Sequence, residues 1–298
     1  MNRISKMLIV IGILLVPTFL IAENRCIPSD SNYYESCMID SIAGMVSEKK
    51  YNYAIELLST YEEWFRSQNK NDSKSMAKIF SSKAAIYYLK GEYEESLKLY
   101  KAAEHIYNSI SDKVMSSEMK SNIAVVLASM NNYSEALKVI GEAEGFYRNG
   151  KYNIDLADLL YNKGIIYFFQ NDYDRGYVAF SEAEKLYLKE NLKIRYLLTQ
   201  VLKGIVKAKS QEYKEALFLC ENNILSFSLK YYCIALANEG LGKREEAKRS
   251  YQMAIERIDR NVSKTLEGSG DAAAQAISEK YAPIFTDYLL FMLRNSIR

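Results

Sequence analysis

The chain has 298 residues, of which 49% are hydrophobic, so it can bury a substantial core. Only 3 prolines and 13 glycines are present. A barrel, a sandwich or a disordered tail would need more of these turn-forming residues. The 39 basic and 37 acidic side chains nearly cancel and form no run of like charge, so we expect no nucleic-acid-binding surface.

The first 22 residues predict an export signal. Arg3 and Lys6 precede Met7–Ala22, an uncharged and mostly apolar run that ends where polar sequence begins. The run is shorter than the roughly 20 residues that a membrane-spanning helix needs. We expect either cleavage at the end of this run or retention of residues 1–22 as an inner-membrane anchor, followed by a short segment at 23–31. Both outcomes predict an exported protein, in the bacterial periplasm or at the cell surface.

A short sequence pattern returns every 40 residues. Its copies read GEYEESL, NNYSEAL, NDYDRGY and QEYKEAL, and their tyrosines are Tyr93, Tyr133, Tyr173 and Tyr213. Each tyrosine follows a short polar turn. Apolar and small residues recur at spacings of three, four and seven on both sides of that turn, which is the pattern of an amphipathic helix. Each 40-residue unit is therefore predicted to be a hairpin of two helices.

Small residues mark where the helices of these hairpins are expected to cross. A residue with at most one side-chain carbon lies about seven places before each turn, and a side chain larger than a methyl there would push the two helix axes apart. These positions are Ala84, Ala124, Gly164 and Gly204, and Ala103, Ala143 and Ala183 are expected to do the same between units. The recurring tyrosine would pack through its ring and keep its hydroxyl near water.

This combination of small residues, turn and tyrosine resembles the tetratricopeptide repeat (TPR). The segment AAIYYLKGEYEESLKLYKAAEHIY at 84–107 matches best, and weaker units at 47–65 and 235–258 extend the resemblance to roughly residues 32–262. The resemblance implies an all-α, right-handed superhelical solenoid of about six helical hairpins. The 40-residue period, against the usual 34, implies longer helices than in the common repeat.

Residues 263–298 do not continue the repeat. A flexible break, EGSGD at 267–271, precedes the apolar segment YAPIFTDYLLFML at 281–293. We expect this segment to be a helical cap over the exposed face of the last repeat, which solenoids require. It also resembles the linker that joins TPR arrays to CHAT-type caspase-like peptidases. That second resemblance implies an alternative function, a regulatory or truncated relative of such a peptidase.

The four cysteines allow two interpretations. Cys220 and Cys233 lie seven residues before and six residues after a predicted turn near Phe227, so two antiparallel helices would bring them to similar height, as a disulfide requires. Cys26 and Cys37 would close a small loop near the N-terminus of an exported chain. The alternative is that all four are reduced, with Cys220 and Cys233 acting as small buried apolar residues.

The chain is poor in groups that could perform catalysis. His105 is the only histidine and is expected at the surface of a second helix, and the cysteines lack C-x-x-C spacing. No glycine-rich phosphate loop is present. The sequence therefore predicts a protein that is not an enzyme and that uses no cofactor or metal. A hydrolase with a site made of carboxylates alone is the remaining catalytic alternative.

The resemblance implies that the first helix of each hairpin lines a concave groove that takes an extended peptide or a partner's helix. Asn122 and Asn162 lie two residues before a small crossing residue, and a carboxamide can both donate to and accept from a ligand backbone. Ser82 takes the matching place one unit earlier. Apolar candidates for the same face are Tyr88, Tyr161, Ile165, Phe168 and Phe169. The alternative for residues 165–169 is a core segment buried on both sides.

The predicted function is therefore an exported scaffold that binds a protein or peptide partner in this groove, with envelope assembly as the expected setting. No nucleic-acid partner is predicted. Contact with a membrane is predicted only through the N-terminal segment, if that segment is retained.

Overall fold

The computed structural model describes residues 42, 45–46, 50–67, 74–225 and 227–266. The predicted export signal, the N-terminal cysteine pair and the predicted cap beyond residue 266 lie outside these residues. The chain divides into two compact units, and the boundary between them falls inside one helix, at Glu144. Each unit is described by itself.

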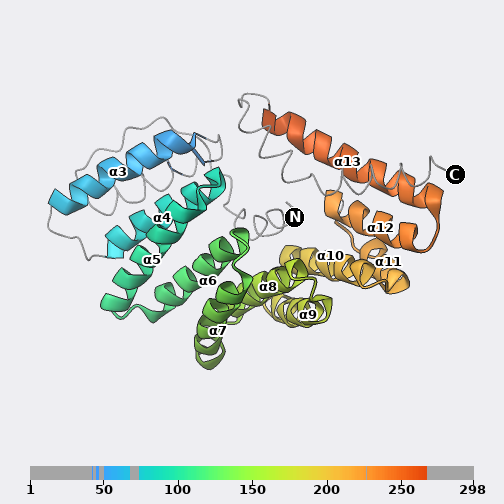
Figure 1. Cartoon of the computed structure of the whole chain (residues 1–298), viewed down its shortest axis with the longest axis horizontal. Helices are drawn as coiled ribbons and strands as arrows, with labels where there is room; N and C mark the ends of the chain where they lie inside the picture. Colours follow the sequence, from blue (N-terminus) through green and yellow to red (C-terminus); the bar gives the residue numbers. More distant parts are fainter. Residues whose placement is uncertain (1–41, 43–44, 47–49, 68–73, 226, 267–298) are drawn as a thin grey trace. The chain divides into compact units, whose positions relative to one another are not determined.

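Helices account for the regular structure of the described residues (Figure 1). In chain order they are α3 (Tyr51–Ser67), α4 (Lys74–Lys90), α5 (Tyr93–Ser109), α6 (Lys113–Ser129), α7 (Tyr133–Gly150), α8 (Asn153–Phe169), α9 (Tyr173–Lys189), α10 (Lys193–Lys209), α11 (Tyr213–Glu221), α12 (Ser228–Gly240) and α13 (Arg244–Leu266). The predicted all-α array of helical hairpins is confirmed.

The 40-residue period follows from the helix lengths and the turns. Most helices from α4 to α10 have 17 residues, about 25 Å, and successive helices are separated by short turns. Helices α4 to α10 and α12 are each followed within two residues by a residue with positive φ; these residues are Gly91, Ser111, Asn131, Lys151, Asn171, Asn191, Gln211 and Gly242. In the α6–α7 turn, the amide of Asn131 donates to the carbonyl of Ala128 at 3.0 Å and that of Asn132 to Leu127 at 2.8 Å. These two hydrogen bonds satisfy carbonyl groups that would otherwise have no partner at the end of the helix.

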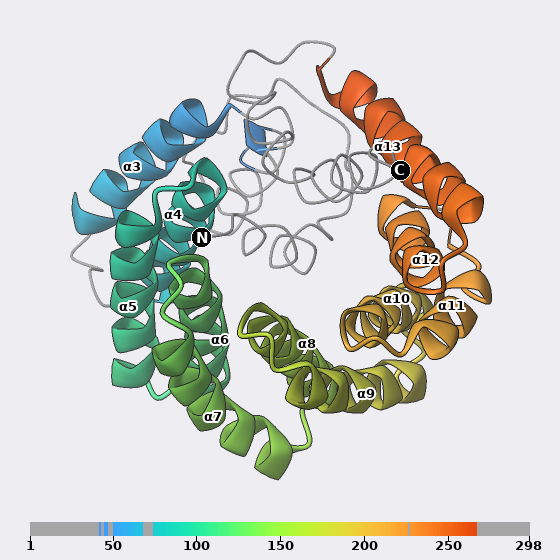
Figure 2. The same cartoon turned by 45° about the vertical axis from the view of Figure 1, so that its right-hand side comes forward.

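The unit of residues 13–143 packs its helices in two layers. The first helices of the hairpins, α4 and α6, form one layer, and the second helices, α3, α5 and the larger part of α7, form the other (Figure 2). Ala84 and Ala103 are fully buried. The hydroxyl of Ser96 donates to the carbonyl of Ala84 at 2.8 Å, so α5 meets the backbone of α4 directly. A larger side chain at residue 84 would separate these two helices.

The unit that contains residues 144–266 repeats this arrangement, with α8, α10 and α12 as first helices and α9, α11 and α13 as second helices (Figure 2). A Cβ atom at Gly164 would lie 2.8 Å from the ring of Phe180. At Gly204 it would lie 2.3 Å from the sulfur of Cys220. Both glycines are therefore required by close packing, as the crossing positions predict.

The regular period ends at α11. The sequence predicts a hairpin turn near Phe227. In the structure α11 has only 9 residues and ends at Glu221, and α12 has 13 residues, whereas α13 has 23. Both α11 and α12 are thus shorter than the regular 17-residue helices. The last helix, α13, is the longest of those described.

The recurring tyrosines are only half-buried. Tyr133 and Tyr173 each donate their hydroxyl to the asparagine two residues before, at 2.8 and 2.9 Å, at the edge of the hairpin. A second tyrosine series is fully buried instead: Tyr107, Tyr147 and Tyr187, also 40 residues apart. This second series belongs to the aromatic core.

Candidate partner-binding face on the first helices

The polar candidates lie on the side of the first helices that faces away from the hairpin partner. Asn122 precedes the buried Ala124 by two residues, which is about 200° around the helix, and Asn162 stands in the same relation to Gly164. Both asparagines and Ser82 are half-buried. Neither carboxamide makes a hydrogen bond to another residue in the described part of the chain. Each is therefore available to a ligand.

In the unit of residues 13–143, Tyr88 belongs to the core rather than to an open face. Only 4% of it is exposed, and its hydroxyl lies 3.1 Å from the hydroxyl of Ser129 on α6. Burial raises the pKa of Tyr88, so its hydroxyl stays neutral. Its ring packs against Tyr93 with 5.6 Å between centroids. Tyr88 thus joins α4 to both α5 and α6.

The apolar candidates on α8 are divided by the structure. Tyr161, Ile165 and Phe168 are 6%, 0% and 8% exposed. The rings of Tyr161 and Phe168 contact Phe180 and Tyr173 of α9, at 5.8 and 5.7 Å between centroids. For Ile165 and Phe168 the structure thus supports the core interpretation that the sequence left open. Phe169 is half-buried and is the member of this set with the most open position.

A charged cluster that the sequence did not reveal adjoins Asn162, one helical turn away on α8. Asp158 accepts a hydrogen bond from the hydroxyl of Tyr187 at 2.6 Å and pairs with Arg195 of α10. Burial, with the nearby carboxylate of Asp158, raises the pKa of Asp155. The face around Asn162 therefore combines an amide, an ion pair and a second carboxylate.

Solved structures with the same arrangement of helices exist. No family model and no curated protein matches the chain. The structure of BtubC from P. vanneervenii is similar at a TM-score of 0.60 and 13% identity, over 74% of this chain and 94% of that one. A Rap protein complexed with Competence and Sporulation Factor matches at a TM-score of 0.60 and 16% identity, over 88% of this chain and 75% of that one. The Rap conjugation regulator of plasmid pLS20, in complex with the Phr* peptide, matches at 0.54 and 14% identity, over 91% and 80%. The Rap proteins are TPR proteins. The chain has the TPR fold.

The TPR array also contains ion pairs that tie three of the first helices, α4, α8 and α10, to the second helix of the hairpin before. The pairs are Lys83–Glu62 at 2.6 Å, Lys163–Glu144 at 2.7 Å and Lys203–Glu184 at 2.6 Å. Burial acts to raise the pKa of Glu144, but hydrogen bonds from Lys163 and Arg148 outweigh it and the pKa is lowered. The lysine directly precedes the small crossing residue in three of the four regular units. The position of these lysines is regular in the sequence, but their glutamate partners lie 19 or 21 residues away.

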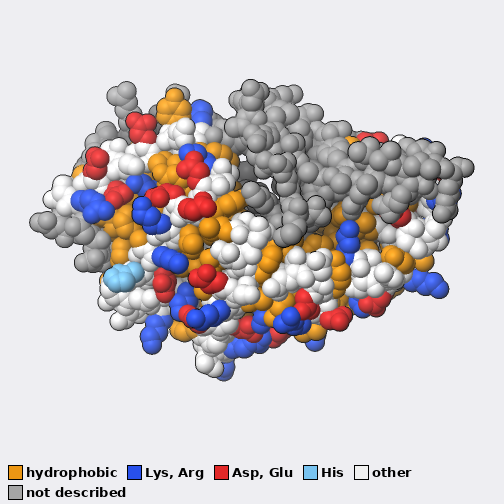
Figure 3. Space-filling view, viewed as in Figure 1, with side chains coloured by type: hydrophobic (Ala, Val, Ile, Leu, Met, Phe, Trp, Pro, Cys, Tyr) orange, Lys and Arg blue, Asp and Glu red, His pale blue; other side chains and the backbone are white. Residues whose placement is uncertain are grey.

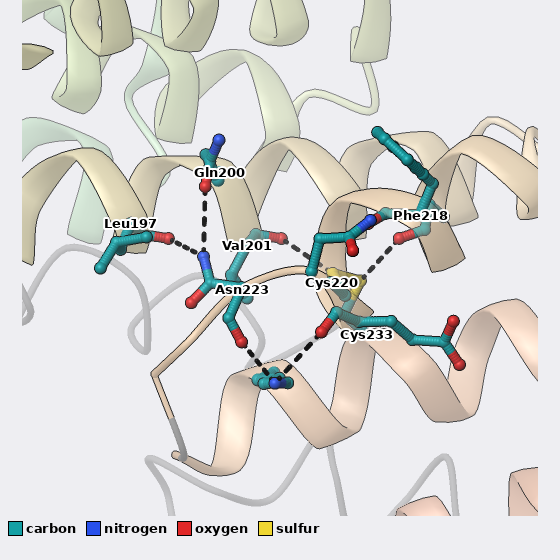
Figure 4. The surroundings of a disulfide bond; sticks show 11 residues. Leu197, Gln200, Val201, Phe218, Cys220, Asn223 and Cys233 are labelled. Atoms are coloured by element: carbon teal, nitrogen blue, oxygen red, sulfur yellow. Dashed lines mark hydrogen bonds between the residues drawn. A yellow bond between two sulfur atoms is a disulfide. The ribbon is translucent and has the colours of Figure 1, made fainter.

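A disulfide joins the two shortened helices of the TPR array, between Cys220 of α11 and Cys233 of α12 (Figure 4). Both cysteines are fully buried. Beside the disulfide, Asn223 is 1% exposed, and its amide donates to the carbonyl of Leu197 on α10 at 2.7 Å. The turn after α11 is therefore attached to α10 by a hydrogen bond, at the point where a regular, longer α11 would have continued. Cys26 and Cys37 lie outside the described residues.

Groups that could support catalysis are sparse in the described part of the TPR array. No group of three His, Cys, Asp or Glu side chains there could hold a metal ion. None of the described helices is long and apolar enough to cross a membrane. His105 is exposed on α5, and Figure 3 shows the histidine at the surface among charges of both signs.

Proposed function

We propose that the protein is an exported TPR scaffold that binds an extended segment of a partner protein or peptide on its first helices. The carrying observation is the same in each unit taken by itself: a half-buried asparagine, Asn122 in the unit of residues 13–143 and Asn162 in the other, has a carboxamide with no hydrogen-bonding partner among the described residues. The backbone of a ligand would satisfy both the donor and the acceptor of such a carboxamide. Such a bond recognises the main chain and not a particular side chain.

The structural neighbours support this proposal at the level of ligand class. Two Rap structures that share the fold were solved with a bound factor or peptide. Export to the periplasm or cell surface, and a role in envelope assembly, are proposals that rest on the N-terminal sequence of residues 1–22. The scaffold function requires no catalytic group.

Site-specific photo-crosslinking in cells tests the proposal. A photoreactive amino acid at residue 162 is expected to capture a partner that mass spectrometry identifies. The same probe at Val178, which is 65% exposed on α9, is the matched control and should not capture it. Equal capture from both positions, or capture from residue 178 alone, would place the partner on the other layer and contradict the proposal.

The asparagine side chains should matter for binding and not for stability. Asn162→Ala removes no hydrogen bond to a described residue, so the free energy of unfolding should change by less than about 0.5 kcal/mol. Loss of a backbone hydrogen bond in the complex should weaken binding of the captured partner by about 5- to 10-fold. Isothermal titration with that partner and urea melts measure the two effects. A large loss of stability with unchanged affinity would make Asn162 a structural residue.

A further inference from the structure

Two carboxylates share one cation on the first two turns of α8. Asp158 pairs with Arg195 of α10 and accepts a hydrogen bond from the hydroxyl of Tyr187. Asp155, one turn before Asp158, is exposed and forms no ion pair with a described residue. The charged groups that act on Asp155 are Asp158 and Arg195. This group of three side chains is therefore one positive charge short of balance.

The pKa of Asp155 reflects the missing charge. A carboxylate in the first turn of a helix is ordinarily favoured by the partial positive charge of the helix N-terminus. Here partial burial, and then the nearby carboxylate of Asp158, raise the pKa of Asp155, and Arg195 only lessens the rise. The exposed lysines of the adjacent turns, Lys151 and Lys193, form no ion pair with it in the described part of the chain. An additional cation beside the two carboxylates would relieve their repulsion.

A buried hydroxyl without a partner lies at the same place. Tyr161 follows Asp158 by three residues, so both side chains lie on one side of α8. Only 6% of Tyr161 is exposed, its ring packs against Phe180 of α9, and its hydroxyl has no hydrogen bond to a described residue. After burial, the carboxylate of Asp158 raises the pKa of Tyr161, and Tyr161 is among the groups that raise the pKa of Tyr187, so the hydroxyl lies close to the ion pair. Buried polar groups in proteins have partners as a rule, so this hydroxyl points to a group that the described chain does not supply.

Asn162 connects this acidic site, formed by Asp155, Asp158 and Tyr161, to the proposed partner segment. It lies four residues after Asp158 on α8, which is about 6 Å along the helix axis. Each residue of an extended chain spans about 3.3 Å. A peptide residue within two positions of the one that bonds to Asn162 can therefore bring its side chain to Asp158.

We propose that the partner segment carries a lysine or arginine whose charged group binds between Asp155 and Asp158, with the hydroxyl of Tyr161 as a third acceptor. This proposal rests on the proposed function, because the same segment is held through its main chain at Asn162. An anion would add a third negative group, since the guanidinium of Arg195 is already engaged by Asp158. An uncharged side chain would leave Asp155 without a counter-charge. Asn162 thus recognises the main chain of the partner, and the acidic site recognises its sequence.

Peptide selection tests which residue the acidic site takes. Short random peptides displayed on phage are selected on the full chain, and synthetic copies are titrated against the wild-type chain, Asn162→Ala and Asp155→Asn. The selected peptides should share a lysine or arginine at one fixed position. Asp155→Asn, and methionine in place of that basic residue, should each weaken binding about tenfold, and together little more than either alone, because both remove the same contact.

Two further variants separate the acidic site from a merely charged surface. Asp174 is the matched control, because it is likewise an exposed aspartate in the first turn of a helix, α9. Asp174→Asn should leave the affinity unchanged. Tyr161→Phe should weaken binding about 3- to 10-fold without lowering the urea midpoint, since the hydroxyl that it removes has no partner among the described residues of the free chain.

The outcomes distinguish this proposal from the proposed function. Peptides that depend on Asn162 but share no basic residue, or share an acidic one, would overturn this proposal and leave the proposed function standing. A basic residue that couples to Asp174 as strongly as to Asp155, or an affinity unchanged by Tyr161→Phe, would also overturn it. Peptides with a basic residue coupled to Asp155 that bind Asn162→Ala equally well would support the acidic site and contradict the main-chain contact. A selection that yields no peptide dependent on Asn162 or Asp155 would overturn both.

Discussion

Replacing Tyr187 by alanine is expected to lower the free energy of unfolding by about 3–5 kcal/mol, as truncation of a buried aromatic residue does. Tyr187 is 2% exposed, and its hydroxyl donates to Asp158. Tyr173→Ala, in the same helix, should cost only about 1 kcal/mol, because Tyr173 is half-buried at the hairpin edge and its cavity would open to water. Urea melts followed by circular dichroism compare the two variants directly.

Tyr187→Phe separates the hydroxyl from the ring. It keeps the aromatic core and removes one hydrogen bond to a charged acceptor, so we expect a loss of about 1.5–3 kcal/mol. The part of the Tyr187→Ala loss of stability that Tyr187→Phe does not reproduce is then due to the cavity left by the ring. Should Tyr173→Ala prove as damaging as Tyr187→Ala, the repeated tyrosine of the sequence pattern, and not the buried series, would be the main packing residue.

The hairpins could be predicted because two kinds of signal coincide at three of the turns. The tyrosine spacing fixes the period, and a residue tolerant of positive φ stands at several turns, as at Gly91, Asn131 and Asn171. Glycine and asparagine adopt that conformation at little cost, so the turns are visible in the sequence. Lys151 adopts it too, and no propensity rule would have selected a lysine there.

The binding face could be predicted only in part, because the first helices are buried on more than one side. Residues 201–206 of α10 are all buried, and residues 123–129 of α6 likewise. A run of six or more buried residues covers every direction around a helix, so hydrophobic periodicity no longer separates the core from a face open to partners. The sequence therefore grouped Ile165 and Phe168 with Phe169, although the first two pack in the core.

Contacts between residues distant in the sequence account for the rest. Asp158 and Arg195, which form an ion pair, are 37 residues apart. Asn223, in the α11–α12 turn, donates a hydrogen bond to a carbonyl 26 residues earlier. Such pairs depend on the register of one helix against another and are not encoded in a local pattern. The turn was assigned near Phe227 because no proline or glycine marks the earlier end of α11 at Glu221.

Removal of the Cys220–Cys233 disulfide is expected to lower the free energy of unfolding by about 2–4 kcal/mol, because the bond closes a loop between residues 13 apart and restricts the unfolded chain. The double variant Cys220→Ala, Cys233→Ala tests this without reducing the other cysteines. Amide exchange should accelerate most in α11 and α12, since α11 has only 9 residues and few helical bonds of its own. Loss of protection confined to α8 and α9 would contradict this assignment.

Gly204 offers a sharper test of the same contact. A Cβ at this position would lie 2.3 Å from the sulfur of Cys220 and 2.8 Å from that of Cys233, whereas Ala84 and Ala124 accommodate a methyl at the equivalent place. Gly204→Ala should therefore destabilise the oxidised protein by about 1–3 kcal/mol through overpacking. In the double cysteine-to-alanine background both sulfur atoms are gone, so the same substitution should cost markedly less. The difference is a coupling energy that a double-mutant cycle measures by urea melts. Additive losses would mean that the glycine serves the backbone of α10 and not the disulfide that packs on it.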